Sequence, residues 1–399
     1  MAMNVSFNYT TAPSGLNTSN VTPVVMFMSD DNLTNITSSD VGTGSHLGPM
    51  SPATTSLWTI VGLSVVFLVI VIIGVVGNGL VIFVILLDRK MRQSITNLFI
   101  MNLAIADLLI MMFGIPEIIQ FMMRTGWILG PIACKSNRFI MTVSLYASVL
   151  CLVSVCIERF VAIVFPIKAH IVCTRKKILC VIAFIWPVAI GCGLPTLLFN
   201  QVTPVVPGLS LCRIIFPGNN FQFFIIFKYL ESVLFYFQPM IIQIVLYAVI
   251  GRRLYASTEE LNTRFQMRPD AHSKTERSAD TIKARKGVVK MLIASVLIYF
   301  ISYSPQQIHL LYNTFSRTPF PESWPFLVFV MIITHVNSAA NPVLYSIFSQ
   351  NFRRNFKRCL CFICYRMERK AYRRTRFDSF DSRAVSRRNS TSRTTMSRV

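Results

Sequence analysis

Residues 57–87 read LWTIVGLSVVFLVIVIIGVVGNGLVIFVILL, a stretch without a charged side chain. A helix that crosses a lipid bilayer needs ~20 predominantly apolar residues, and this run exceeds that length. The whole chain has a matching composition, because 53% of its 399 residues are hydrophobic and only 14% are charged. Soluble domains carry about 25% charged residues. The run therefore predicts a membrane-spanning helix.

Further apolar runs follow the first one along the chain. One such run alone could be a helix buried in a soluble core, but a series joined by short polar links is typical of a membrane bundle. The sequence thus predicts an all-α membrane protein, a seven-transmembrane helix bundle over residues 57–348. The runs cover approximately residues 57–87, 97–123, 134–164, 178–200, 222–250, 287–314 and 325–348.

Basic residues predict the orientation of these spans. The first 56 residues contain no Lys or Arg, whereas Asp88-Arg89-Lys90-Met91-Arg92 directly follows the first run. Because basic loops stay in the cytoplasm, we expect an extracellular N-terminus and a cytoplasmic C-terminus. The loops that this topology places inside hold 33 of the 39 Lys and Arg residues. The net charge of +22 is therefore explained by the topology and not by nucleic-acid binding, and the basic cytoplasmic surface suits anionic membrane lipids. We expect a multi-pass protein of the plasma membrane.

Residues 1–56 form a polar segment rich in Ser and Thr. We expect it to be extracellular, disordered and glycosylated, because Asn-X-Ser/Thr marks an acceptor for N-linked glycans. Six such sequons occur, at Asn4, Asn8, Asn17, Asn20, Asn32 and Asn35.

The other end of the chain is basic. Residues 349–365 are expected to form a short amphipathic helix along the membrane after the seventh span. Its cysteines suit palmitoylation, with free thiols as the alternative: Cys359, Cys361 and Cys364.

Residues 366–399 are expected to form a disordered cytoplasmic tail. Phosphorylation would add negative charge there and favour arrestin recruitment, while a tail that stays unmodified is the alternative. The expected phosphorylation sites are Ser379, Ser382, Ser386, Ser390, Thr391, Ser392, Thr394, Thr395 and Ser397.

Two of the ten cysteines fall on the side expected to be extracellular, where disulfides are stable. Cys134 opens the third run and Cys212 lies in the loop before the fifth. A bond between them would hold that loop over the bundle. Cysteines inside the spans are expected to pack as small apolar residues.

Asp107 lies in the middle of the second run. A charged group at that depth is costly unless it faces the bundle interior and has a partner. Hydroxyl and amide side chains of other spans could surround it, and such oxygens would bind a monovalent cation. A neutral Asp that only hydrogen-bonds between helices is the alternative.

Over about residues 55–365 the chain resembles the rhodopsin-like (class A) G-protein-coupled receptors. Glu158-Arg159-Phe160 is similar to the family's Asp/Glu-Arg-Tyr triplet, and the last run contains Asn341-Pro342-Val343-Leu344-Tyr345. The interval of 25 residues between Cys134 and Arg159 also matches the family. Further landmarks are Gly77-Asn78, Leu103-Ala104-Ile105-Ala106-Asp107, Trp186, Pro195, Pro239, Tyr247 and Pro305.

This resemblance implies a receptor with no catalytic residues and no cofactor. An extracellular agonist would favour outward movement of the sixth helix, which opens a cleft for a heterotrimeric G protein, with Gq/11 as the expected class. The implied sodium pocket, which would stabilise the inactive state, consists of Asp107, Ser148, Asn337, Ser338 and Asn341. The implied switch and coupling residues are Glu158, Arg159, Phe160, Tyr247, Tyr303, Pro305, Asn341, Pro342 and Tyr345.

The sixth run departs from the family pattern at two positions. Tyr303 replaces the Trp usual beneath the ligand pocket, which changes the packing there. Arg285 occupies the inner position often held by Glu, so Arg159 has no acidic partner across the bundle. We therefore expect appreciable basal activity.

The expected ligand is a peptide, and within that class a neuropeptide. Met141 replaces the Asp of amine receptors and His335 replaces the Lys of opsins, so neither ligand class is expected. The stretch 158–169 is similar to thyrotropin-releasing-hormone and ghrelin receptors, and residues 202–216 resemble the β-hairpin of peptide receptors. Charged, amide and imidazole side chains in the outer halves suit a peptide, although some could pair with one another or face lipid headgroups. Together with Met141, the expected ligand-binding residues are Glu117, Gln120, Arg138, Glu231, Gln306, Gln307, His309 and His335.

Two other functions stay open. A class A receptor for a non-peptide small molecule or lipid is one of them. A membrane transporter is the alternative from a different class, but the internal repeats that it would require are not found.

Overall fold

The computed structural model describes residues 57–123, 125–206, 209–219, 221–267, 272–316, 323–359 and 361. Its elements are α1 (Leu57–Leu87), α2 (Arg89–Gln93), α3 (Ile95–Met122), α4 (Gly130–Val164), α5 (Pro166–Val172), α6 (Arg175–Phe199), β1 (Asn200–Val206), β2 (Leu209–Ile214), η2 (Pro217–Asn219), α7 (Phe221–Ser232), η3 (Val233–Phe237), α8 (Gln238–Met267), α9 (His272–Phe315) and α10 (Trp324–Phe348). A last helical segment covers residues 350–359.

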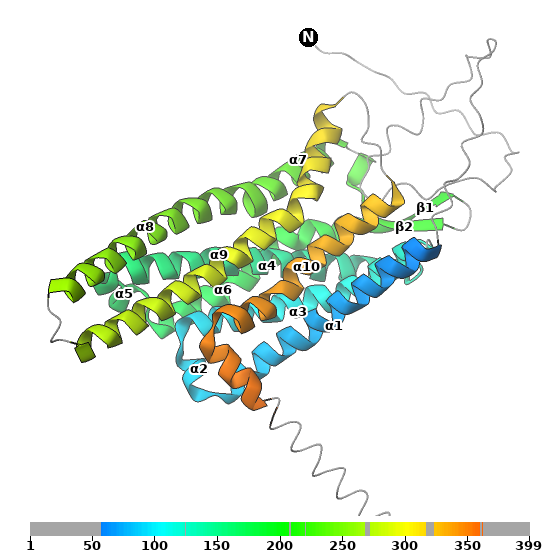
Figure 1. Cartoon of the computed structure of the whole chain (residues 1–399). Helices are drawn as coiled ribbons and strands as arrows, with labels where there is room; N and C mark the ends of the chain where they lie inside the picture. The colour runs from blue at the N-terminus through cyan, green and yellow to red at the C-terminus, as the bar shows by residue number, and fades with distance from the viewer. Residues whose placement is uncertain are drawn as a thin grey trace, which may run out of the picture.

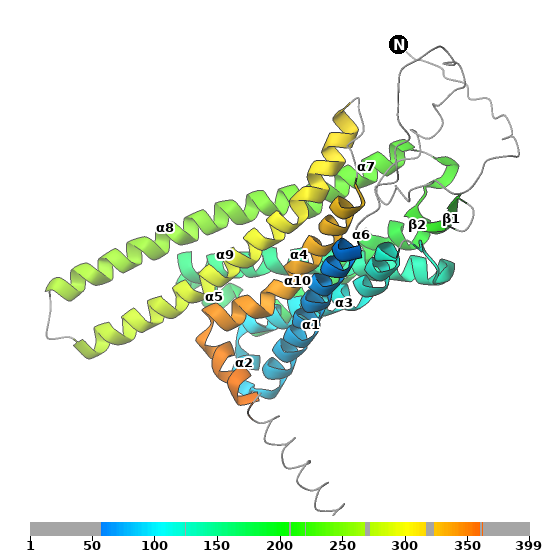
Figure 2. The same ribbon diagram turned by 45° about the vertical axis from the view of Figure 1, so that its right-hand side comes forward.

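Seven helical segments of the described chain are long and apolar enough to cross a membrane, with α7, η3 and α8 forming one continuous span. The helices lie side by side in one bundle (Figure 1). The β1–β2 hairpin lies at one end of it, here called the hairpin end. The opposite end, called the α5 end, carries α2, α5 and the segment 350–359. In Figures 1 and 2, α8 and α9 extend beyond the other helices at the α5 end.

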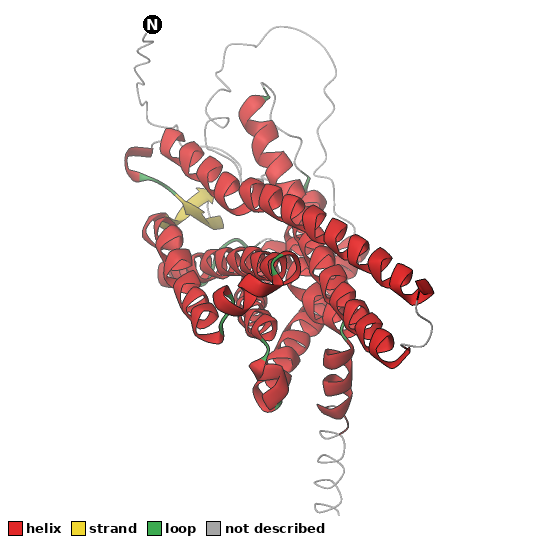
Figure 3. Cartoon of the chain, turned by 90° about the vertical axis from the view of Figure 1, so that its left-hand side faces the viewer, coloured by secondary structure: helices red, strands yellow, loops and turns green. Residues whose placement is uncertain are grey.

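The seven-helix fold class predicted from the sequence is confirmed, and Figure 3 shows the hairpin as the strand structure beside the helices. The segment 350–359 is amphipathic, as expected. Phe352, Phe356 and Cys359 are buried on one face, whereas Arg353 and Arg354 are exposed on the other.

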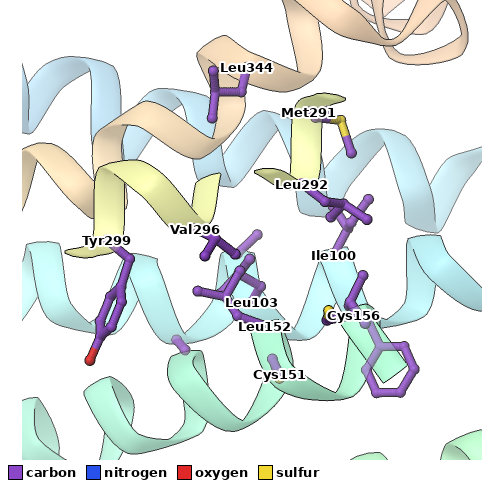
Figure 4. Close-up of a cluster of buried hydrophobic side chains, with 14 of the residues drawn as sticks. Ile100, Leu103, Cys151, Leu152, Cys156, Met291, Leu292, Val296, Tyr299 and Leu344 are labelled. Carbon is purple, nitrogen blue, oxygen red and sulfur yellow. The ribbon is translucent and has the colours of Figure 1, made fainter. Parts of the chain in front are cut away.

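The core lies between the central helices. In an apolar 18-residue window of each helix, 67% of α10 and 61% of α3 is buried inside the bundle. The corresponding share of α1 is 11%, so most of α1 faces lipid. Figure 4 shows Val296 of α9 directed toward Leu103 of α3 and Leu152 of α4. Lipid tails are as apolar as these helix faces, so burial from lipid gives no hydrophobic gain. Close packing of the side chains therefore decides which faces of the helices meet.

The hairpin is antiparallel, with Val202 opposite Cys212. Cys212 forms a disulfide with Cys134 of α4, and their Cα atoms are 5.6 Å apart. This confirms both the predicted bond and the expected hairpin. At the hairpin end, a small hydrophobic cluster packs Trp127 against the disulfide.

Several predictions concern residues outside the described part of the chain. These are the six sequons at Asn4, Asn8, Asn17, Asn20, Asn32 and Asn35, the thiol of Cys364, the side chain of Arg285 and all nine tail phosphorylation sites from Ser379 to Ser397.

Candidate functional site

The Glu158-Arg159-Phe160 triplet lies in the last turns of α4, at the α5 end. Arg159 Nε donates a hydrogen bond of 2.5 Å to Glu158 Oε2, and the guanidinium forms an ion pair with the same carboxylate. The hydroxyl of Thr96 in α3 donates to Oε2 over 3.4 Å. Glu158 therefore holds Arg159 locally and links α4 to α3. Phe160 packs edge-on against Phe165, with ring centroids 5.7 Å apart.

The motif from Asn341 to Tyr345 lies in α10 against α1. A Cβ atom at Gly77 would come within 2.8 Å of Pro342 Cβ, so only glycine fits this contact. Beside it, Asn78 Nδ2 donates to the carbonyl of Ser338 over 3.0 Å. The Gly77-Asn78 landmark thus works by letting α1 approach the kinked part of α10 closely.

Tyr345 connects the bundle to the last helical segment. Its ring is buried and stacks on Phe352, with centroids 5.3 Å apart and planes 28° apart. Tyr247 of α8 is buried in the same core. The structure therefore brings the predicted switch residues of α4, α8 and α10 to the α5 half of the bundle.

A polar cluster surrounds Asp107 of α3, which is fully buried. Asn341 Nδ2 donates to Asp107 Oδ2 over 2.8 Å, so α3 and α10 are linked here. Three other buried oxygens have no hydrogen-bond partner among the described residues: Asp107 Oδ1, Ser148 Oγ and Ser338 Oγ. Asn337 Nδ2 is also buried and without such a partner.

This donor set fits a monovalent cation. It offers one carboxylate oxygen and two hydroxyl oxygens that have no hydrogen-bond partner among the described residues, and a buried carboxylate needs compensation. If sodium binds, Asp107, Ser148, Ser338 and the oxygens of Asn337 and Asn341 are the residues that would hold it. The cation would supply positive charge to a buried, polar junction of three helices.

The residue in the Trp position, Tyr303, is buried in α9 and packs against Tyr299, with ring centroids 4.9 Å apart. The Tyr299 hydroxyl donates to the backbone carbonyl of Phe235 over 2.6 Å. Phe235 lies in η3, a π-helical turn just before Pro239. Such turns leave carbonyls out of the regular helical ladder, and here a side chain of α9 uses one.

A second link across the same interface involves the next residue of η3. The hydroxyls of Tyr236 and Ser304 share a hydrogen bond of 2.7 Å. The Tyr236 hydroxyl also lies 3.4 Å from the backbone carbonyl of Phe300. Hydroxyl contacts of Tyr236 and Tyr299 therefore join the fifth and sixth spans close to Tyr303.

Glu117 of α3 and Arg138 of α4 form an ion pair of 2.9 Å near the hairpin end. The guanidinium also donates to the carbonyl of Cys212 over 3.4 Å, which ties the hairpin to the pair. Glu117 Oε2 and Arg138 Nε have no further partner among the described residues. The pair keeps one acceptor and one donor for other groups.

His335 of α10 packs against α3 at Gly114, one helical turn before Glu117. Its Nδ1 is 2.8 Å from the carbonyl of Met331, and its ring packs edge-on against Phe67. A Cβ atom at Gly114 would be 2.0 Å from His335 Nε2, so the glycine makes room for the ring.

Other predicted ligand residues have local contacts. The Gln120 amide donates to Pro116 and accepts from the backbone of Ile128, so both of its ends are engaged. Met141 accepts a weak contact from Asn137. Gln306 is partly exposed, Gln307 Oε1 is buried without a described partner, and His309 contacts Asn313.

Glu231 takes part in a separate cluster. It pairs with Lys228 at 2.9 Å and accepts a hydrogen bond of 2.9 Å from the hydroxyl of Tyr146 in α4. The Tyr146 ring stacks on Phe235, with centroids 3.7 Å apart. The sequence did not predict a contact for Tyr146. The available signal was the presence of Lys228 and Glu231 within the fifth apolar run, because charges inside a span need a polar partner.

The chain was also compared with known protein families and with individual proteins. A profile of the family described as 7 transmembrane receptor (rhodopsin family) matches residues 77–345. The chain belongs to the rhodopsin family of seven-transmembrane receptors. The class A resemblance inferred from the sequence is therefore confirmed, and the family consists of receptors rather than enzymes. Its members are multi-pass proteins of the plasma membrane.

Relatives of this receptor carry peptide names. Neuropeptide receptor 15 of Caenorhabditis elegans is 32% identical over 309 residues, covering 73% of this chain and 87% of that protein. The thyrotropin-releasing hormone receptor of Gallus gallus is 31% identical, covering 72% of this chain and 76% of that receptor. The tachykinin-like peptides receptor 86C of Drosophila melanogaster is 28% identical, covering 82% of this chain and 63% of that protein.

Proposed function

We propose that this receptor binds an extracellular peptide, and within that class a neuropeptide, at its hairpin end and activates heterotrimeric G proteins at its α5 end. The observation that carries the proposal is the Glu117–Arg138 pair, which is tied to the hairpin through the carbonyl of Cys212. Peptide backbones and termini offer the complementary donors and acceptors. The similarity to receptors named for peptides supports the same ligand class.

The charge pattern supports an assignment of the two ends. Basic loops stay in the cytoplasm, and Arg89, Lys90 and Arg92 belong to α2 at the α5 end. With that orientation the hairpin and the disulfide face the outside of the cell. The exposed basic face of the segment 350–359 would then lie against anionic lipids of the inner leaflet.

The switch follows from the same orientation. Agonist binding would favour a state in which the inner half of α9 moves outward and Arg159 leaves Glu158 to contact the G protein, with Gq/11 as the proposed class. The ligand can do this only by binding the two states with different affinity. The hydroxyl contacts between η3 and α9 beside Tyr303 would rearrange in the same step. A sodium ion held by Asp107 would favour the inactive state.

Modification and desensitisation complete the proposal. We assign palmitoylation to Cys361, which is exposed, ahead of Cys359, which is buried. Phosphorylation of the tail from Ser379 to Ser397 would recruit arrestin, and the sequons from Asn4 to Asn35 would carry glycans.

A screen of neuropeptides on cells that express the receptor tests the proposal, with calcium and cyclic AMP as readouts. Once an agonist is found, Glu117→Ala and Arg138→Ala should each raise its EC50 by about tenfold or more, because each leaves a buried charge unpaired. Ser136→Ala is the matched control, since this hydroxyl bonds only within its own helix.

Surface expression is measured in parallel for every variant. Unchanged potency in both charge variants at normal expression would reject the pocket. Substrate uptake into membrane vesicles without any G-protein response would instead favour a transporter.

A further inference from the structure

A recess of about 340 Å³ lies at the hairpin end, outside the Glu117–Arg138 pair. Its walls are the last turn of α6, the first residues of β1, the chain from the end of β2 through η2, and Lys135 of α4. The volume is within the range of small-molecule sites, which is about 300–1,000 Å³. Neither residue of the ion pair contributes to these walls.

Lys135 gives the recess a positive charge. Its ammonium donates one hydrogen bond, of 3.3 Å, to the carbonyl of Leu198. An ammonium has three donors, so two of them are available to a ligand. Within the described part of the chain, no carboxylate lies within 4.0 Å of this ammonium. Of the described residues that line the recess, Lys135 carries the charge.

The other walls of the recess are mixed, with the polar side chains of Asn200 and Gln201 beside an apolar side formed by Leu198, Phe199, Ile215 and Phe216. Phe199 and Phe216 lie with ring centroids 4.9 Å apart, and Phe216 continues to Phe227 of α7 at 5.8 Å. Leu198 is 58% exposed and Leu194, one turn earlier, is 42% exposed, on a span that ends at Phe199. Because Leu198 both lines the recess and lies on the lipid-facing side of α6, hydrocarbon can reach the recess from the bilayer.

We propose that the recess binds an anionic amphiphile from the membrane. Its carboxylate or phosphate accepts hydrogen bonds from the Lys135 ammonium, and its hydrocarbon lies against Phe199, Phe216 and Leu198. Lys side chains at the ends of spans place their charge at the headgroup level, which is where such a headgroup lies. A free fatty acid and an acidic phospholipid share this chemistry.

The recess is joined to the hairpin by short contacts. The backbone N–H of Ile215 donates to the carbonyl of Phe199 over 3.0 Å. Lys135 directly follows Cys134, which forms the disulfide with Cys212. The backbone carbonyl of Cys212 in turn accepts the hydrogen bond from Arg138. Resting on the proposed function, the amphiphile should therefore also change agonist potency, because it fixes the position of the hairpin.

The binding test needs no agonist, so it stands apart from the proposed function. The full-length receptor is purified into phosphatidylcholine nanodiscs and exposed to a diazirine derivative of palmitic acid or to the matching palmityl alcohol. After irradiation, the modified peptides are mapped by mass spectrometry. The acid should label the segment 198–218, and the alcohol should label it about tenfold less or weaker still.

Three variants locate the site. Lys135→Gln should lower labelling by the acid about tenfold, Lys135→Arg should retain it, and Gln201→Trp should abolish it by filling the recess. Arg213→Gln, on the neighbouring strand, is the control and should label normally. Thermal unfolding of each variant confirms that it is folded.

Competition identifies the source of the amphiphile. Displacement by phosphatidylglycerol and not by oleate assigns the site to a phospholipid, and the reverse assigns it to a free fatty acid. Equal labelling by acid and alcohol, or unchanged labelling in folded Lys135→Gln, would overturn the proposal.

Discussion

The hydrogen bond from Tyr146 to Glu231 gives a quantitative test of the packing between the third and fifth spans. Replacing Tyr146 by Phe removes one hydroxyl and leaves the ring to stack on Phe235, at 3.7 Å between centroids. The carboxylate keeps its ion pair with Lys228, at 2.9 Å, so no charge is left alone. The change therefore isolates a single contact of 2.9 Å.

Hydrogen bonds between transmembrane helices contribute about 0.6 kcal/mol on average and about 1.7 kcal/mol at most. A charged acceptor roughly doubles the strength of a neutral pair. The Glu231 side chain is 21% exposed, which weakens the contact relative to a fully buried one. We expect Tyr146→Phe to lower the free energy of unfolding by about 1 to 1.5 kcal/mol.

The assay is a double-mutant cycle on the purified receptor in mixed micelles. It uses Tyr146→Phe, Glu231→Gln and the double variant, with unfolding followed by denaturant titration. Tyr229→Phe is the matched control, because that hydroxyl is buried but has no hydrogen-bond partner among the described residues. If the two single effects add within about 0.3–0.5 kcal/mol, the residues do not interact and the reasoning fails.

Further expectations concern three other places in the receptor. Gly114→Ala should displace His335 and destabilise the receptor by about 1–3 kcal/mol, and the double variant Gly114→Ala/His335→Ala should recover much of this loss. Thermal unfolding measures both effects, and an unchanged Tm in the single variant would contradict the contact. Asp107→Asn should abolish any dependence of agonist binding on sodium concentration, measured against potassium, and a retained dependence would remove Asp107 from the cation site. Burial raises the pKa of the Cys359 thiol, so its thiolate forms only at higher pH and iodoacetamide at pH 8 should modify Cys361 first; equal rates would contradict the burial.

The bundle itself could be predicted from hydropathy, because each span must satisfy its own backbone hydrogen bonds in lipid. The basic, amphipathic stretch after the seventh span predicted a short helix over residues 349–365, and the structure has a helix there over residues 350–359. The bond between Cys134 and Cys212 followed from their place on one side of the membrane.

The partners of the outer charges could not be predicted in this way. The sequence identified Glu117, Arg138 and Glu231 as outer polar residues, and the structure pairs the first two with each other. Glu231 instead contacts Lys228, as its spacing along one helix allows, and the hydroxyl of Tyr146 from another. Whether the unsatisfied atoms of the Glu117–Arg138 pair contact a peptide stays a prediction.

The sequence alone determined that seven apolar segments cross a membrane, which of their residues are polar, and on which side the basic loops gather. Only the tertiary structure decided which faces of those helices meet. A span is apolar both toward lipid and toward its neighbours, so hydropathy does not distinguish the two sides. The contact of Gly77 with Pro342 and the carbonyl of Phe235 that η3 presents to Tyr299 depend on how closely two helices approach, and this is set by packing across the whole bundle.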